Sequence, residues 1–288
     1  MTGFFAAGRW WDVTQDESEQ IKHASDRLAG AGIENALNDA RLLWSAALPR
    51  RFENHTDVTD GGVLDRFDAL VARRAAREPL SHLVGYRDFY KHRFVVTPDV
   101  LDPRPDTETL VEVAGSEPFK RVLDLGTGSG CILLSLLAEQ TDALGVGTDL
   151  SHAALKVAAQ NVARLELDHR VELLRSDWYD VVSGTFDLIV SNPPYIAAVE
   201  MPALQPEVRD YEPRLALTDG ADGLSCYRDI VAGASRHLVP NGRLAVEIGP
   251  TQAAVVTELL HAQGFAETRV TQDLDGRDRV VSARYPAK

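Results

Sequence analysis

The spacing of apolar positions changes near residue 85 of this 288-residue chain. From residue 17 to about 84 the apolar side chains recur at helical spacing, with few strand signals. The positions that fit a small bundle are Leu28, Leu37, Leu42, Leu43, Trp44, Ala47 and Leu48. A capped helix start is expected at Asn38, and a second helix over about 64–77. Residues 1–84 are therefore predicted to form an N-terminal helical-bundle domain.

Alternation replaces the helical period over the next residues. The alternating apolar residues are Tyr86, Phe89, Tyr90, Phe94 and Val96. This pattern predicts a β-hairpin, and we expect residues 85–105 to link two domains. Asp106 is then expected to cap a helix that begins at Thr107, and Arg104 is expected to pair with Glu108 rather than reach a cofactor.

From Lys120 onward short apolar runs alternate with helical patterns, which predicts a doubly wound parallel sheet in an α/β domain over residues 106–288. The expected strands are 122–125, 144–149, 171–178, 186–191 and 242–249, with a closing hairpin of 267–270 and 279–285. Helices are expected at 151–165 and 251–263. The polar segment 196–225 is long for a loop in a compact domain, so it is interpreted as a substrate lid.

A glycine-rich loop follows the first strand of this sheet. It consists of Gly126, Thr127, Gly128, Ser129 and Gly130, and a helical pattern starts at Cys131. Glycines let the backbone approach a ligand closely, and a helix N-terminus offers free N–H groups to an anionic group. A dinucleotide fingerprint requires glycine where Cys131 stands, and the lysine of a P-loop is absent. The loop therefore predicts a nucleotide-like cofactor and disfavours a nicotinamide oxidoreductase.

Acidic residues lie at or near the ends of successive predicted strands. Asp124 belongs to the first, Asp149 ends the second, and Asp177 with Trp178 ends the third. An acid after the second strand can accept hydrogen bonds from ribose hydroxyls, and an aspartate beside a tryptophan suits a purine amine and its ring face. Taken singly, each acid is more often a helix cap or a solvated loop residue. Their order along the sheet favours a cofactor site.

The fourth strand ends in Asn192, Pro193, Pro194 and Tyr195. Neither proline can donate a ladder hydrogen bond, so the strand must stop in a rigid turn at its carboxyl end, where open α/β sheets bind ligands. The turn offers an amide side chain, backbone carbonyls and an aromatic ring. This combination suits a planar, weakly nucleophilic NH2 group, although an isolated Asn-Pro-Pro is more often an ordinary strand end.

Together these motifs are similar to those of class I S-adenosylmethionine-dependent methyltransferases that act on planar nitrogens. Further segments resemble the release factor glutamine methyltransferases of the HemK/PrmC type. The segments are Pro79–Gly85, Pro103–Glu108, Tyr211–Pro213 and Asp219–Leu224. The similarity runs from about residue 79 to the C-terminus. Asp102 is a departure from this resemblance, because an apolar residue is usual at that position.

The resemblance implies a seven-stranded Rossmann-like sheet, S-adenosylmethionine as cofactor, and the glutamine of the Gly-Gly-Gln tip of peptide chain release factors as substrate. The implied cofactor-binding residues are Asp124, Gly126, Thr127, Gly128, Ser129, Gly130, Asp149, Asp177, Trp178 and Asn192. The implied catalytic residues are Asn192, Pro193, Pro194 and Tyr195. The N-terminal domain would dock the body of the release factor.

Composition limits the possible partners. The formal net charge is −13, with 43 acidic against 30 basic residues, which disfavours a protein that follows a phosphate backbone. Two cysteines and eight scattered histidines give no metal-ligand pattern. We expect no metal, no direct contact with nucleic acid, no membrane association, a cytoplasmic location and a monomer.

Three functions remain to be compared. In the favoured one, the Asn192 side-chain oxygen and the Pro193 carbonyl accept hydrogen bonds from a glutamine amide, while Tyr195 walls the pocket. A nucleic-acid N6-adenine methyltransferase would flip its base into the same pocket, but charge and the lack of a base-reading domain disfavour it. A non-catalytic S-adenosylmethionine-binding module is disfavoured because Asn192 and the loop glycines are all present.

Overall fold

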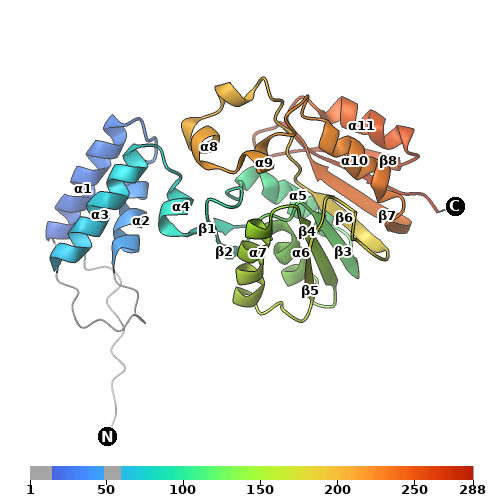
Figure 1. Ribbon diagram of the computed structural model, residues 1–288, viewed down its shortest axis with the longest axis horizontal. Helices are drawn as coiled ribbons and strands as arrows, with labels where there is room; N and C mark the ends of the chain where they lie inside the picture. The colour runs from blue at the N-terminus through green and yellow to red at the C-terminus, as the bar shows by residue number, and fades with distance from the viewer. Residues whose placement is uncertain (1–14, 49–59, 288) are drawn as a thin grey trace, which may run out of the picture. The chain divides into compact units, whose positions relative to one another are not determined.

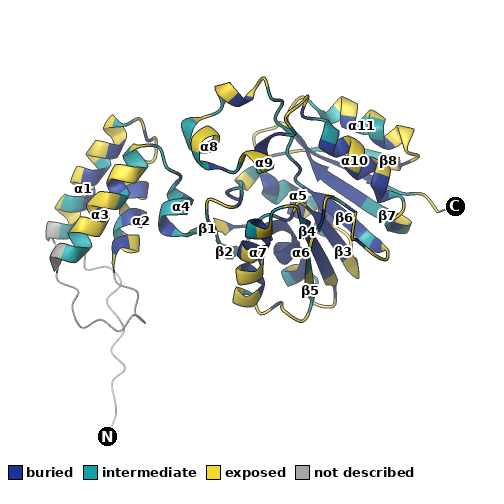
Figure 2. Ribbon diagram, viewed as in Figure 1, coloured by how far each residue is buried: buried dark blue, intermediate teal, exposed yellow. Residues whose placement is uncertain are grey.

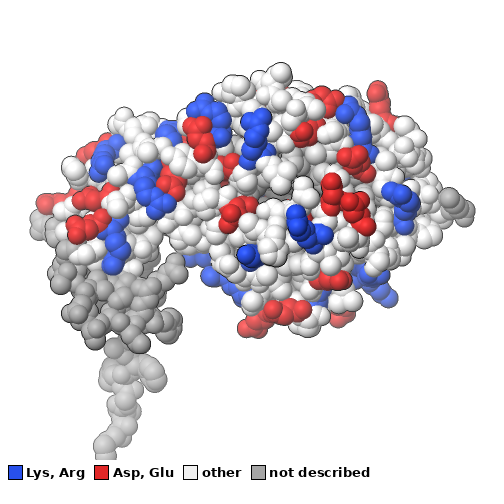
Figure 3. Space-filling view, viewed as in Figure 1, with Lys and Arg blue, Asp and Glu red and all other residues white. Residues whose placement is uncertain are grey.

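The computed structural model describes residues 15–48 and 60–287 (Figure 1). Contacts within the chain divide it into two units, residues 1–84 and 85–288. In the described ranges no helix has the length and apolarity needed to span a bilayer. On the visible face of the second unit, acidic and basic side chains are mixed, with no continuous basic stripe (Figure 3).

The described part of the first unit is helical. Its helices are α1 (Gln15–Gly30), α2 (Ala36–Ala47), α3 (Asp60–Ala75) and α4 (Leu80–Val84). Leu28, Leu43 and Phe67 are fully buried, and the Trp44 ring meets Phe67 edge-on at 5.0 Å between centroids. The sequence prediction was wrong for Leu37 and Leu48, which are 46% and 41% exposed, because both lie off the buried face.

The two helices whose starts were predicted from sequence in this unit, α2 and α3, both begin earlier than the hydrophobic pattern predicts. Helix α2 begins at Ala36 after Asn35, so Asn38 lies inside it rather than capping it. Helix α3 begins at Asp60. Asp39 is buried within α2, where its carboxylate accepts from Arg74 Nε at 2.8 Å. The acid near the predicted helix start therefore joins two helices instead of satisfying backbone N–H groups.

The second unit begins with an antiparallel hairpin of β1 (Tyr86–Phe89) and β2 (His92–Val95). Its two buried rings, Phe89 and Phe94, belong to the main core of this unit. Asn161 fixes the hairpin further, since Val95 N–H donates to its Oδ1 at 2.7 Å and its Nδ2 donates to Val95 O at 3.0 Å. The hairpin predicted as a linker is therefore packed into the second unit.

A seven-stranded sheet forms the centre of the second unit. Its strands are β3 (Arg121–Leu125), β4 (Leu144–Asp149), β5 (Val171–Arg175), β6 (Phe186–Ser191), β7 (Leu238–Glu247), β8 (Ala266–Gln272) and β9 (Asp278–Arg284). The spatial order is β5-β4-β3-β6-β7-β9-β8. The first five strands are parallel, and the hairpin β8–β9 adds antiparallel pairs beyond β7.

Helices cover both faces of this sheet, and its central strands β3, β6 and β7 are largely buried (Figure 2). The helical elements are η1 (Pro105–Thr107), α5 (Glu108–Gly115), α6 (Cys131–Glu139), α7 (His152–Arg164), η2 (Met201–Ala203), α8 (Pro206–Tyr211), α9 (Arg214–Leu217), α10 (Ser225–Ala234) and α11 (Ala253–Ala262). Successive residues of β6 pack into the hydrophobic clusters on opposite faces of the sheet. Leu188 packs with residues of α5 and α6, whereas Ile189 packs with residues of α10 and α11. This explains why the strands read as continuous apolar runs.

The topology predicts where a ligand binds. From β3 the chain moves to β4 and β5 on one side, then crosses to β6 and β7 on the other. The crevice at such a reversal lies outside the carboxyl ends of the strands. The glycine loop follows β3 and Asn192 follows β6, so both lie at this crevice.

Candidate active site

The loop after β3 holds its three glycines in the left-handed region, with φ of 72°, 56° and 81° at Gly126, Gly128 and Gly130. A Cβ added at Gly128 would meet no atom within 4 Å, and one at Gly126 would meet only the Trp178 ring, at 4.0 Å. Gly130 precedes α6, whose first residue is Cys131. The loop therefore presents bare backbone to open space, as close approach to a ligand requires.

That open space is a cavity of about 470 Å³, a size suited to a nucleoside-sized ligand. Nine of the residues predicted from sequence line it: Gly126, Thr127, Gly128, Ser129, Asp149, Asp177, Trp178, Asn192 and Pro194. Four others, Asp124, Gly130, Pro193 and Tyr195, do not line it. The carboxylates of Asp149 and Asp177, the ring of Trp178 and the exposed backbone of the glycine loop fit S-adenosylmethionine.

Asp149 joins the glycine loop to α7. Its Oδ2 accepts from Gly128 N–H at 2.9 Å, and its Oδ1 accepts from Ser151 N–H at 2.8 Å. Burial raises the pKa of Asp149, and the two backbone N–H groups oppose that rise. Each oxygen keeps a second lone pair, so the carboxylate can still accept from a ligand hydroxyl.

Asp177 and Trp178 lie beyond the end of β5, which stops at Arg175. Trp178 has a φ of 43°, an uncommon value for a residue with a large side chain. Its ring is half-buried and packs on the core beneath α10 and α11. The turn thus holds an aromatic edge and an exposed carboxylate at the cavity wall.

Asp124 occupies a different place from the one predicted. It is fully buried within β3, and the Thr127 hydroxyl donates to its Oδ2 at 2.6 Å, while Oδ1 has no hydrogen-bond partner. Burial raises the pKa of Asp124 to about 7, although Thr127 opposes the rise. The side chain holds the glycine loop from behind instead of facing the cavity.

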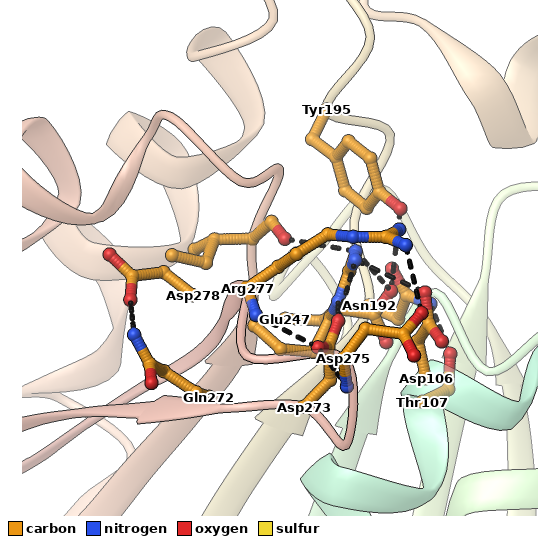
Figure 4. Close-up of polar contacts among 12 residues, drawn as sticks. Asp106, Thr107, Asn192, Tyr195, Glu247, Gln272, Asp273, Asp275, Arg277 and Asp278 are labelled. Atoms are coloured by element: carbon orange, nitrogen blue, oxygen red, sulfur yellow. Dashed lines mark hydrogen bonds and ion pairs between the residues drawn. The ribbon is translucent and has the colours of Figure 1, made fainter.

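Asn192 and Tyr195 leave the end of β6 in different directions (Figure 4). Asn192 Nδ2 donates to Thr107 Oγ1 at 3.2 Å, at the cavity wall. The Tyr195 hydroxyl donates to Glu247 Oε1 at 3.4 Å, and Tyr195 O accepts from Gln252 Nε2 at 2.9 Å. Tyr195 therefore fixes the turn against β7 and α11, whereas Asn192 faces the cavity.

Sequence reasoning missed a buried charge cluster next to Asn192. Glu247 ends β7 and is 1% exposed, with Arg279 Nη1 at 4.0 Å from Oε1. Arg279 Nη2 also contacts Asp106 and Asp273, each at 3.1 Å. Burial raises the pKa of Glu247 to about 7, while Thr107, then Arg279, oppose the rise. In the sequence, the only indication of this cluster was that Glu247 is a charged residue within the otherwise apolar end of the strand predicted over 242–249.

Two predictions for the segment before α5 were wrong. Arg104 does not pair with Glu108: its Nη2 donates to the buried Glu212 Oε1 at 2.6 Å, and Glu108 accepts from Tyr90 N–H at 2.8 Å. Asp106 caps no helix, because Pro105–Thr107 form a 3-10 turn and α5 begins only at Glu108. Its carboxylate is held instead by Arg279.

The buried carboxylate of Asp102 is stabilised by two nearby arginine side chains. It is 5% exposed, with Arg87 Nη1 at 3.7 Å and Arg104 Nη1 at 3.9 Å from its Oδ2. These ion pairs bring the Asp102 carboxylate close to Glu212, and its charge contributes to a pKa of Glu212 raised to about 7, after burial as the main cause.

The segment predicted as a polar lid contains short helices. Elements η2, α8 and α9 all lie within residues 196–225. Pro213, Leu215, Ala216 and Thr218 line the cavity beside the glycine loop. Asp219 then organises the turn before α10. Although burial favours the neutral acid, hydrogen bonds from Ser225 and from backbone N–H groups hold its pKa at about 2.

Sheet order, glycine loop and the turn at Asn192 together define a methyltransferase, and comparison with known families agrees. Residues 88–205 match the Methyltransferase small domain, and residues 19–85 match the PrmC N-terminal domain. A release factor glutamine methyltransferase from Cereibacter sphaeroides is 53% identical over 94% of this chain and 99% of its own length. A second release factor glutamine methyltransferase, from Rhodospirillum rubrum, is 44% identical over 91% of this chain and 82% of its own length. The chain belongs to the release factor glutamine methyltransferase family.

A solved structure supports the fold independently of close sequence similarity. A methyltransferase from Pyrococcus furiosus is 18% identical, covers 76% of this chain and 98% of its own, and gives a TM-score of 0.52. The Rossmann-like methyltransferase fold and the family resemblance expected from the sequence are thus confirmed.

Proposed function

We propose that this chain transfers a methyl group to the side-chain nitrogen of the glutamine in the Gly-Gly-Gln motif of peptide chain release factors. The position of Asn192 carries the proposal: its Nδ2 is held by Thr107 at the cavity wall, which leaves Oδ1 for a substrate amide. The names of its relatives supply the substrate class. We assign docking of the release factor body to the unit that matches the PrmC N-terminal domain, and we expect a monomer.

The methyl donor is S-adenosylmethionine, which supplies an electrophilic methyl group when bound. Asp149 would accept hydrogen bonds from ribose hydroxyls, because each of its oxygens keeps a lone pair beside the backbone N–H group that it already binds. Asp177 and Trp178 would hold the purine amine and ring. The backbone at Gly126 and Gly128 would admit the remainder of the molecule without steric conflict.

A carboxamide nitrogen is a poor nucleophile because its lone pair is delocalised into the carbonyl group. Asn192 Oδ1 and the Pro193 carbonyl oxygen would accept hydrogen bonds from its two N–H groups and aim the lone pair at the methyl group. Orientation of this kind can lower a barrier by roughly 7–11 kcal/mol at best. The same acceptors would stabilise the positive charge that develops on the nitrogen as its bond to the methyl group forms, and the methylated nitrogen would then lose a proton to solvent water.

Intact-mass analysis of unmodified release factor tests the function. One methyl group should be added in the presence of this protein and S-adenosylmethionine, and none when the glutamine of the Gly-Gly-Gln motif is replaced by glutamate. Labelled methyl on DNA or RNA, with no addition to folded release factor, would instead identify an adenine methyltransferase.

The variant Asn192→Ala should lower kcat about 100-fold or more, because misplacement of the nucleophile is costly in rate. Its Kd for S-adenosylmethionine should stay within about threefold of wild type, since the alanine leaves the glycine loop intact. Calorimetry measures Kd and the mass assay measures kcat. Wild-type turnover would show that Asn192 does not hold the substrate amide.

A further inference from the structure

Arg104 is the only lysine or arginine among the described residues that line the cofactor cavity. Its side chain is 33% exposed, so the guanidinium is accessible from the cavity. Neither the proposed cofactor contacts nor the proposed grip on the substrate amide uses this cation. Five acids line the same cavity, namely Asp99, Asp149, Asp177, Asp219 and Asp229.

Two buried carboxylates hold Arg104 in place. Its Nη2 donates to Glu212 Oε1 at 2.6 Å, and its Nη1 lies 3.9 Å from Asp102 Oδ2. The side chains of Glu212 and Asp102 are 1% and 7% exposed. Glu212 lies between α8 and α9, far from Arg104 in the chain. The guanidinium is therefore fixed by two acids, and its other N–H groups remain for a ligand.

The segment that carries Arg104 crosses the carboxyl ends of the strands. Before it, Val100 packs against α7, which follows β4. After it, Asp106 lies 3.1 Å from Arg279 of β9, on the opposite side of β6. The proposed cofactor carboxylates belong to the ends of β4 and β5. The segment thus runs from the cofactor side of the cavity toward the side beyond Asn192.

Arg104 lies one turn from the residue that contacts Asn192. Thr107 N–H donates to Arg104 O at 3.1 Å, and Thr107 Oγ1 accepts from Asn192 Nδ2 at 3.2 Å. Figure 4 shows Thr107 next to Asn192. The partner of Arg104, Glu212, directly precedes Pro213, which lines the cavity. Both neighbours place the guanidinium on the side of the cavity where the acceptor amide binds.

We propose that Arg104 recognises the acceptor segment by donating to a main-chain carbonyl oxygen of the two glycines before the glutamine, and that Glu212 positions it for this contact. The inference rests on the proposed function for the identity of the substrate. Glycines have no side chains, so an enzyme can select them only through main-chain groups and the absence of a Cβ. A guanidinium held by a buried acid suits this task, because little side-chain freedom is lost on binding.

Charge favours a neutral carbonyl over another anion as the ligand of Arg104. The guanidinium already contacts two carboxylates, so the carboxylate of S-adenosylmethionine would add a third acid. The N-terminus of α6, after the glycine loop, is a better place for that group. The side-chain carbonyl of the glutamine is also unsuitable, because a cation there would oppose the positive charge that develops on the nitrogen. The main chain of the glycines is the remaining acceptor.

Replacing Arg104 by methionine removes the donors and keeps a long, unbranched side chain. Arg104→Met should lower kcat/KM for release factor roughly 10- to 150-fold, mainly through KM, because one charge-assisted hydrogen bond is lost. Kd for S-adenosylmethionine should stay within about threefold of wild type, as measured by calorimetry.

A double variant separates recognition from a purely structural role. Arg104→Met leaves Glu212 as an uncompensated buried charge, whereas Arg104→Met combined with Glu212→Gln does not. The double variant should keep the defect in KM. Glu212→Gln alone should lower kcat/KM less than about tenfold, since Arg104 retains its donors and the glutamine oxygen still accepts.

Arg87→Met is the matched control. Arg87 Nη1 lies 3.7 Å from the same Asp102 oxygen, and its side chain is 34% exposed, but it does not line the cavity. Its replacement should change KM and kcat by no more than about twofold.

The outcomes separate the inference from the proposed function. An unchanged KM in Arg104→Met, recovery of wild-type KM in the double variant, or a Kd for S-adenosylmethionine that rises as much as KM would overturn the inference. The proposed function would stand in each case, because the wild type still methylates release factor. If the wild type methylates no release factor, the proposed function is overturned and the inference with it.

Discussion

A single carboxylate, Asp149, holds two backbone segments of the cofactor cavity in register. It accepts from Gly128 N–H and Ser151 N–H, so the glycine loop and the start of α7 are tied to the end of β4. In Asp149→Asn one of these N–H groups would face an NH2 group. An unpaired buried donor costs about 1–3 kcal/mol, so Kd for S-adenosylmethionine should rise roughly 5- to 150-fold, as measured by calorimetry.

Asp142 offers a matched control for that variant. It is exposed and precedes β4, whereas Asp149 ends the same strand. Asp142→Asn removes the same charge without touching the cavity and should leave Kd unchanged. An equal loss of affinity in both variants would mean that net charge, rather than the two hydrogen bonds of Asp149, governs binding.

At this scale the sequence predicted which residues reach the cavity better than it predicted how they are held. Asp149 and Asn192 could be identified because Asp149 ends one strand, and Asn192 directly follows another, at the crevice. Asp124 has the same sequence signal, but it lies one residue inside its strand and is fully buried. The cluster around Glu247 joins residues far apart in the chain, and no local pattern encodes such pairings.

Among the elements, the segment between β6 and α10 depends on two glycines with nearly equal backbone angles. Gly220 has a φ of 75° and Gly223 a φ of 76°. A Cβ at Gly223 would lie 2.3 Å from Tyr195 O, whereas one at Gly220 would meet nothing within 4 Å. Gly223→Ala must therefore displace the turn that carries Asn192, because the obstructing atom belongs to the backbone.

Both alanine variants incur the left-handed strain of about 1–2 kcal/mol, so both should lower the free energy of unfolding by about that amount. Only Gly223→Ala should also lower kcat, by roughly tenfold or more, through displacement of the turn. Urea unfolding and the methylation assay measure the two effects. Equal kcat values in the two variants would show that the turn tolerates the shift.

Strand and helix order was predictable because parallel strands buried on both faces leave unmistakable apolar runs. The ends of the elements were less predictable, since α2 starts at Ala36 rather than after Asn38. The short helices within the polar segment after β6 were not predicted either. The local sequence pattern also could not predict that β9 pairs directly with β7, because this pairing joins residues that are far apart in the chain.

For the whole molecule, three buried carboxyl groups make the stability of the fold depend on pH. Burial raises the pKa of Asp124, Glu212 and Glu247 to about 7 each. Their pKa values in the unfolded chain are near 4, so the folded state binds more protons between these values. The stabilisation they provide is complete below about pH 4 and is lost as the pH rises through 7.

The free energy of unfolding should therefore be higher at pH 6 than at pH 8, by about 1 kcal/mol for each group. Urea unfolding at both values measures the difference, and Asp124→Asn should reduce it by about one third, because it removes one of the three groups. A free energy of unfolding that increases toward pH 8 would contradict the buried, protonated carboxyls.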